Sequence, residues 1–183
     1  MNLESYRFVE QELTAENVIG KSILEVGSLN VNGTVQDYLL SLQPESYLSV
    51  DIAEGDCVDE ICDANDLVSR YGENRFDIVI TTEMMEHVFD WRNVISNLKR
   101  VCKKNGIIII TTRSEGFPYH GFPTDYWRFS ILDFAVIFDD CDILTLKKDL
   151  AEPGVFVKVQ KTNGFNEKSL ANYNLKRILH YEK

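Results

Sequence analysis

Several features that would mark a membrane or secreted protein are missing from this sequence. Its apolar runs stay short of the roughly 18 residues that a membrane-spanning helix needs. The first residues, "MNLESYRFVEQEL", have neither the basic region nor the apolar stretch of an export signal. The four cysteines form no CxxC pair and no zinc-binding pattern with histidine. We therefore expect a cytoplasmic protein with reduced thiols, no membrane partner and no metal site.

Positive charge is also scarce, with 19 Lys and Arg residues against 29 Asp and Glu residues. The net charge of -10 repels phosphate backbones, so we expect no nucleic-acid partner. The one concentrated basic run, "NLKRVCKKNG" at 97–106, predicts a helix C-terminus, where cations interact favourably with the helix dipole. A chain of 183 residues favours one domain over 1–183.

Apolar periodicity predicts strands that alternate with helices after a lead-in helix over 1–20. The predicted strands are 21–28, 46–53, 76–85 and 106–113, and the helices between them are 34–42, 66–72 and 91–106. This alternation is typical of a parallel sheet with helices on both faces. Segments 142–150 and 154–161 are separated only by "AEPG", which is too short for a parallel crossover. The sequence therefore predicts a Rossmann-like α/β fold, mostly parallel, with a C-terminal antiparallel hairpin.

The last part of the chain, a tail over 162–183, follows this hairpin. Its residues 168–183 could form a helix that packs on the same subunit or on a second copy. A homodimer is therefore one of the expected assemblies.

Polar residues follow the predicted strands at the edge where open α/β sheets bind ligands. Gly27 would let the backbone approach a ligand, and Asp51 could accept hydrogen bonds from both hydroxyls of a ribose. Further glycines are missing after Gly27, where Leu29 and Val31 would crowd a pyrophosphate. A ligand with adenosine but no phosphate fits better, and S-adenosylmethionine is such a ligand. A nicotinamide-dependent oxidoreductase remains an alternative.

Five motifs in order resemble those of the class I S-adenosylmethionine-dependent methyltransferases of the small-molecule type. They are "LEVGSLNVNG", "VDI", "CDAND", "FDIVITTEMMEHV" and "CKKNGIIIITT", and the resemblance covers residues 22–161. It implies S-adenosylmethionine as cofactor and S-adenosylhomocysteine as product. The positions that it assigns to the cofactor are Glu25, Gly27, Ser28, Asp51, Ile52, Asp63, Ala64 and Glu83.

A long aromatic loop over 113–130 is the expected acceptor site, because such loops in compact domains are usually functional. Its candidate substrate-binding residues are Arg113, Tyr119, Asp125, Tyr126, Trp127 and Arg128. The two arginines could clamp a carboxylate or phosphate. Alternatively, Asp125 could pair with Arg128 while Trp127 packs as a buried anchor.

Two histidines are candidate catalytic residues, because methylation of an alcohol requires removal of a proton. His120 lies in the loop and is the preferred base; a loop-ordering hydrogen bond is its alternative role. His87 follows Glu86 and could equally bond nearby backbone. We expect a methyltransferase that acts on the oxygen of a small polar acceptor, anionic or sugar-linked. A non-catalytic cofactor-binding partner subunit is the remaining alternative.

Overall fold

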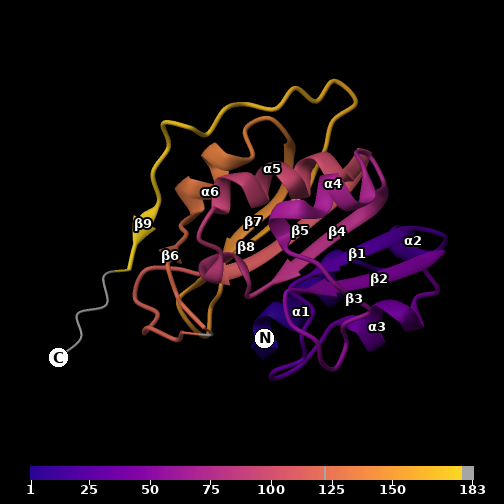
Figure 1. Ribbon diagram of the computed structural model, residues 1–183, viewed down its shortest axis with the longest axis horizontal. Helices are drawn as coiled ribbons and strands as arrows, with labels where there is room; N and C mark the ends of the chain where they lie inside the picture. The colour runs from indigo at the N-terminus through magenta and orange to yellow at the C-terminus, as the bar shows by residue number, and fades with distance from the viewer. Residues whose placement is uncertain (122, 179–183) are drawn as a thin grey trace.

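A computed structural model describes residues 1–121 and 123–178 of the chain. Its main feature is a seven-stranded sheet of order β3-β2-β1-β4-β5-β8-β7 (Figure 1). These strands are β1 (Ser22–Val26), β2 (Ser46–Asp51), β3 (Glu60–Ile61), β4 (Phe76–Thr82), β5 (Cys102–Arg113), β7 (Asp142–Lys148) and β8 (Gly154–Gln160). Strands β3, β2, β1, β4 and β5 are parallel to their neighbours, whereas β8 is antiparallel to both β5 and β7. The predicted Rossmann-like fold with a terminal hairpin is confirmed.

Helices cover both faces of this sheet. The helical elements are α1 (Leu3–Glu12), α2 (Ala15–Val18), α3 (Gln36–Ser41), η1 (Ala64–Asp66), α4 (Leu67–Tyr71), η2 (Met85–His87), α5 (Trp91–Val101) and α6 (Ile131–Ile137). One core lies beneath α4, α5 and α6 and includes the fully buried Trp91, Leu98 and Phe134. A second core joins α1 and α3 to the other face through Phe8, Leu39 and neighbouring residues. Within the described residues, no helix has the length and apolar character needed to cross a bilayer.

The lead-in segment differs from the single helix expected over 1–20. Helix α1 ends at Glu12, and Leu13 adopts an extended conformation with its side chain fully buried. Thr14 then forms a capping box with Asn17, which starts the short helix α2. Burial of Leu13 and this local cap therefore divide the segment into two helices.

Helix α5 ends at Val101 rather than at Gly106, so the predicted helix 91–106 is too long. Strand β5 begins at Cys102, and its register against β4 shifts between Phe76 and Ile78. Gly106 lies in this irregular stretch, where an added Cβ would be 2.8 Å from the carbonyl oxygen of Asp77. The glycine that looked like a helix end instead permits close contact between two strands.

The described part of the tail contains no helix, which corrects the expectation for 168–183 as far as residue 178. The tail runs along α5 and α6 and ends in strand β9 (Lys176–Arg177), which pairs with β6 (Trp127–Arg128). The guanidinium of Arg92 donates to the carbonyls of Leu170 and Tyr173, and these bonds hold the tail extended. Residues 179–183 of the predicted helix lie outside the described residues.

The carboxylate of Asp77, near the start of β4, forms an ion pair with the irregular part of β5, and the contribution of this pair to stability can be tested. Burial alone would raise the pKa of Asp77, but Lys103 at 2.8 Å and hydrogen bonds from Ser22 lower it to about 2. A carboxyl whose pKa is lower in the folded state stabilises the fold above its unfolded pKa and loses this contribution as pH falls. Between about pH 4 and pH 2 we expect a loss of about 1–2 kcal/mol, allowing for solvent screening.

Urea unfolding of the wild type and Asp77→Asn at pH 6 and at pH 2.5 measures this loss. The difference in stability between the two proteins should be clearly smaller at pH 2.5 than at pH 6. An Asp142→Asn variant, which changes an exposed carboxylate of β7, is the control and should follow the wild type at both pH values. A constant difference between wild type and Asp77→Asn would show that the ion pair does not carry this pH dependence.

Candidate active site

The glycine turn after β1 lies where the strand order reverses, between β1 and β4. Gly27 has φ +78°, and both its N–H and that of Ser28 donate to the carbonyl of Val50 at 2.9 and 3.1 Å. A Cβ at Gly27 would lie 2.8 Å from Cβ and Cγ of Met84, so the turn packs tightly against the segment after β4. Ser28 is buried, and its Oγ has no hydrogen-bond partner among the described residues. The carboxyl edge of the sheet at such a reversal of strand order is the usual ligand site of an open α/β sheet.

Glu25 lies beneath this turn and is only 2% exposed. Its carboxyl accepts a hydrogen bond from the hydroxyl of Tyr47 on β2. Burial raises the pKa of Glu25 to about 7. Glu25 therefore supports the turn from within the sheet, and Tyr47 is a partner that sequence analysis missed.

Asp51 and Ile52 lie at the end of β2. One carboxylate oxygen of Asp51 accepts from the N–H of Leu29 at 3.1 Å, and the other accepts from the N–H of Ala53 at 3.0 Å. Each oxygen has a second lone pair, so the carboxylate can still accept bonds from a ligand. Ile52 is 64% exposed beside it and offers a flat apolar contact.

The next pair of predicted cofactor residues starts η1. Asp63 is exposed, and its Oδ1 accepts from both the backbone N–H and the side-chain amide of Asn65. Ala64 is buried next to it. Asp63 is thus held in a defined orientation with its other oxygen directed to no described residue.

Glu83 follows β4 in the left-handed region, with φ +56°. Its carboxylate accepts from Ser5 Oγ of α1 at 3.0 Å and pairs with Arg113 at the end of β5. Burial and, to a smaller extent, the negative charge of the nearby Glu86 raise the pKa of Glu83 to about 7, despite the positive charge of Arg113. The same guanidinium contacts Glu152 at 3.2 Å and stacks on the Phe117 ring. Arg113 therefore orders acidic residues at this edge, a role that the sequence did not suggest.

The loop over 113–130 is fixed by a buried ion pair. Arg128 donates to both carboxylate oxygens of Asp125, at 2.6 and 2.8 Å, and also to the carbonyls of Phe117 and Pro118. The Trp127 indole donates to the carbonyl of Val88 at 2.8 Å. The buried-anchor alternative matches this geometry, because the Arg128 donors are engaged by groups of the loop itself.

The loop brings His120 to the segment that follows β4. The ring of His120 packs edge-on against His87, with ring centroids 4.8 Å apart. His120 Nδ1 lies 2.9 Å from Asp125 Oδ2, and His87 Nδ1 lies 2.8 Å from the carbonyl of Thr124. Glu86 is fully buried between this pair and β5, where Thr112 Oγ donates to its Oε2 at 2.7 Å.

Charges at this cluster influence one another. The Glu86 carboxylate raises the pKa of His120, against the opposite effect of burial. Burial alone would raise the pKa of Glu86, but His120, His87 and Thr112 outweigh it and lower the pKa. Sequence analysis named both histidines but assigned no role to Glu86, because nothing in the local spacing shows that the loop returns to it.

The two tyrosines proposed for the acceptor lie near the same cluster. Tyr126 is half-buried, its N–H donates to the Glu86 carbonyl at 2.8 Å, and its ring packs against Phe89. Tyr119 is 40% exposed one residue before His120. Tyr119 thus adjoins His120 in the loop, and the backbone of Tyr126 contacts Glu86.

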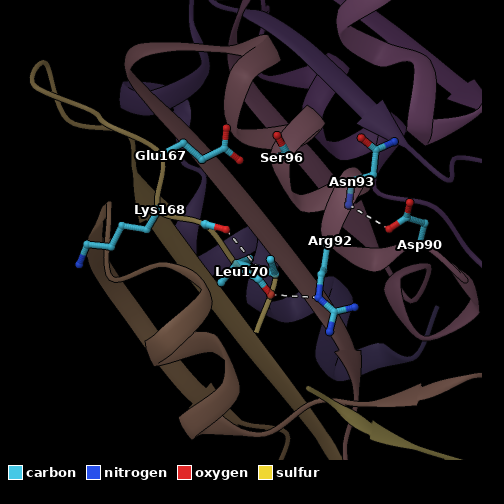
Figure 2. A pocket seen from close by; sticks show the side chains of 9 residues that line it. Asp90, Arg92, Asn93, Ser96, Glu167, Lys168 and Leu170 are labelled. Carbon is cyan, nitrogen blue, oxygen red and sulfur yellow. Dashed lines mark hydrogen bonds between the residues drawn. The ribbon is translucent and has the colours of Figure 1, made fainter. Parts of the chain in front are cut away.

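A separate cavity of about 510 Å³ lies between the first half of α5 and the tail. Figure 2 shows Arg92 and Asn93 on one side of it and Glu167, Lys168 and Leu170 on the other. The bond from Arg92 to the Leu170 carbonyl, at 3.0 Å, links the two sides. None of the residues predicted for cofactor or acceptor lines this cavity.

The chain is similar to known proteins in a segment of its sequence and in its fold. Residues 24–110 match the family model described as "Methyltransferase domain". No curated protein sequence matches the chain. Similar solved structures include an S-adenosylmethionine-dependent methyltransferase from Mesorhizobium loti, with 12% identity and TM-score 0.68 over 87% of this chain and 99% of the other.

Two further structures share the fold. One is the 1,6-didemethyltoxoflavin-N1-methyltransferase of Burkholderia thailandensis with bound S-adenosylhomocysteine, with 16% identity and TM-score 0.68 over 87% of this chain and 79% of the other. The other is the cyclase SpnF, with 13% identity and TM-score 0.67 over 87% and 81% of the two chains. Residues 24–110 thus match a methyltransferase domain, and the chain shares the fold of solved S-adenosylmethionine-dependent methyltransferases.

Proposed function

We propose that this protein is an S-adenosylmethionine-dependent methyltransferase that transfers a methyl group to a hydroxyl oxygen of a small polar acceptor. The observation that carries the proposal is the half-buried cluster of Glu86, His87 and His120, which adjoins the carboxyl ends of β4 and β5. An alcohol loses a proton on methylation, so a site for alcohols needs a group that accepts it. Thioether-forming or amine-directed sites have less need of such a cluster.

The residues at the glycine turn fit the cofactor. Ser28 Oγ is a buried hydroxyl that lacks a partner among the described residues, and a polar amino acid group of the cofactor would supply one. Asp51 would accept from the ribose hydroxyls, Ile52 would pack on the adenine and Asp63 would meet its amino group. When bound, S-adenosylmethionine supplies a methyl group whose carbon bonds to the acceptor oxygen while the carbon–sulfur electron pair passes to sulfur and the hydroxyl proton to a base.

His120 is the proton acceptor in this proposal while its Nε2 is free. Asp125 at Nδ1 fixes the ring orientation and favours the tautomer that leaves Nε2 unprotonated. His87 has its Nδ1 bonded to backbone and supports the ring of His120 by edge-on packing. The loop also accelerates the reaction by positioning the acceptor, because methyl transfer needs the acceptor oxygen in line with the carbon–sulfur bond.

The acceptor class follows from what the loop offers. Arg113 and Arg128, which the sequence suggested as anion clamps, are engaged by Glu83 and Asp125. Tyr119 and Tyr126 belong to the same loop as His120, and aromatic rings pack well on the apolar faces of sugars. We therefore favour a sugar-linked hydroxyl over a free carboxylate or phosphate as the group that is bound.

Calorimetric titration with S-adenosylhomocysteine tests the cofactor assignment. The wild type should bind in the micromolar range, and Asp51→Ala should bind at least about tenfold more weakly, or about 1.4 kcal/mol. Asp56→Ala, which removes an exposed carboxylate nearby, should keep the wild-type affinity. Loss of affinity in the control as well, or tight binding of NADH by the wild type, would contradict the assignment.

Transfer of a labelled methyl group to panels of sugar hydroxyls, carboxylates and amines then tests the acceptor. Label on hydroxyls is the expected result. Label confined to amines would overturn O-methylation, and binding without any transfer would indicate a non-catalytic cofactor-binding subunit.

A further inference from the structure

We propose that Glu86, His87 and His120 bind a divalent transition-metal ion that holds the acceptor hydroxyl. This inference deepens the proposed function and rests on it for the role of the ion, with His120 as a ligand of the ion in place of its role as base, although the binding site stands on its own geometry. It departs from the expectation of no metal site, which was based on the spacing of cysteines and histidines in the sequence.

The three side chains already lie close enough to share an ion. Each offers one ligand atom, and these atoms are all within 4.8 Å of one another. Ligand atoms about 2.1 Å from an ion in a tetrahedral site are about 3.4 Å apart, so the rings need to move by only a small amount. The side chain of His120 is 35% exposed and can make this adjustment.

Both imidazoles are oriented as metal-binding histidines are. The Nδ1 of His120 faces Asp125 Oδ2, and the Nδ1 of His87 faces the Thr124 carbonyl, at 2.9 and 2.8 Å. Each acceptor favours a proton on Nδ1 and therefore leaves the lone pair of Nε2 for a ligand. A carboxylate or carbonyl on the second nitrogen is the usual support of a histidine that binds metal.

Glu86 supplies the independent observation. Its side chain is fully buried and its Oε1 accepts no hydrogen bond from any described residue. His120 Nε2 is the nearby group, but at 3.6 Å it is beyond hydrogen-bond distance. Thr112 fixes the other oxygen at 2.7 Å, so Oε1 is held toward the two rings. A buried carboxylate oxygen that accepts no hydrogen bond is costly, and an ion at the cluster would coordinate it.

The chemistry of the ligands selects the kind of ion. Two imidazole nitrogens and one carboxylate oxygen suit zinc and neighbouring first-row divalent ions better than magnesium or calcium. Three protein ligands leave at least one coordination position open on the exposed side. An acceptor hydroxyl bound there loses its proton to water more easily, and the oxygen takes the methyl group without any change in the oxidation state of the ion.

Metal titration of chelator-treated protein tests the site directly. Zinc measured by calorimetry and cobalt(II) measured by visible absorption should each bind at one site per chain, with absorption bands that indicate nitrogen ligands. Glu86→Gln and His120→Gln should each weaken binding at least tenfold, whereas Glu45→Gln, at an exposed carboxylate, should leave it unchanged. Retained S-adenosylhomocysteine affinity shows that a variant is folded, and His120→Gln decides the test if Glu86→Gln does not fold.

Absence of zinc and cobalt binding in the wild type, or binding that neither substitution weakens, would overturn the metal site. Methyl transfer to hydroxyls by such metal-free protein would still support the proposed function with His120 as base. Conversely, metal binding that both substitutions weaken would support the site even where no hydroxyl is methylated, in which case only the proposed function fails.

Discussion

Replacing Gly27 with alanine is expected to weaken S-adenosylhomocysteine binding by about 30-fold or more, or about 2 kcal/mol. The backbone at Gly27 has φ +78°, a conformation that costs an L-residue roughly 1–2 kcal/mol. The added methyl group would also lie 2.8 Å from Cβ and Cγ of Met84. The turn must shift to relieve both effects, and ligand binding would then have to restore it. Calorimetric titration of the variant measures the loss.

Gly72→Ala separates these two causes. Gly72 has φ +83° at the end of α4, and a Cβ there would meet no atom within 4 Å. This variant carries similar backbone strain, so it should lose stability but keep its cofactor affinity within about twofold, or about 0.4 kcal/mol. The double variant Gly27→Ala with Met84→Ala should recover part of the affinity. Wild-type affinity in Gly27→Ala alone would show that the turn after β1 does not contact the cofactor.

The fold was predictable because its signals are local. The buried strand "SILEV" ends at a glycine, and the four-residue connector "AEPG" can only join antiparallel strands. The prediction that α5 ends at Gly106 was wrong because a glycine there has two explanations in the sequence, a helix cap or a close contact between strands. Only the position of Asp77 decides between them. The prediction of a helix in the tail was wrong because the structure of the tail depends on Arg92, which is distant in the sequence.

The candidate site was predictable to a similar degree. Residues at strand ends, such as Gly27 and Asp51, come together at one edge in any parallel sheet, so the sequence order is sufficient to place them. The contact between Glu86 and His120 depends on the path of an irregular loop, and that path is set by the Asp125–Arg128 pair and backbone bonds. No periodicity encodes such a path, which explains why Glu86 received no role.

Loss of the buried ion pair between Lys99 and Asp140 should give the largest effect on stability. Both side chains are 1% exposed, and Lys99 Nζ donates to both carboxylate oxygens of Asp140 and to the Ile137 carbonyl. Asp140→Ala leaves a buried ammonium without its counter-charge, which costs about 3–5 kcal/mol. For a chain of this size we expect the melting temperature to fall by about 10 °C, measured by circular dichroism.

Glu73→Ala provides a matched comparison, because the partner of Glu73 is on the same helix as Lys99. Glu73 pairs with Arg100, the residue next to Lys99, but these two side chains are 52% and 42% exposed. Exposed pairs contribute little, so this variant should melt close to the wild type. The double variant Lys99→Met with Asp140→Asn removes both charges and should recover more than half of the stability that Asp140→Ala loses. Equal losses of stability in Asp140→Ala and Glu73→Ala would mean that water or a rearrangement of α6 solvates the Lys99 charge. The ion pair between Lys99 and Asp140 would then not be what holds α5 against α6.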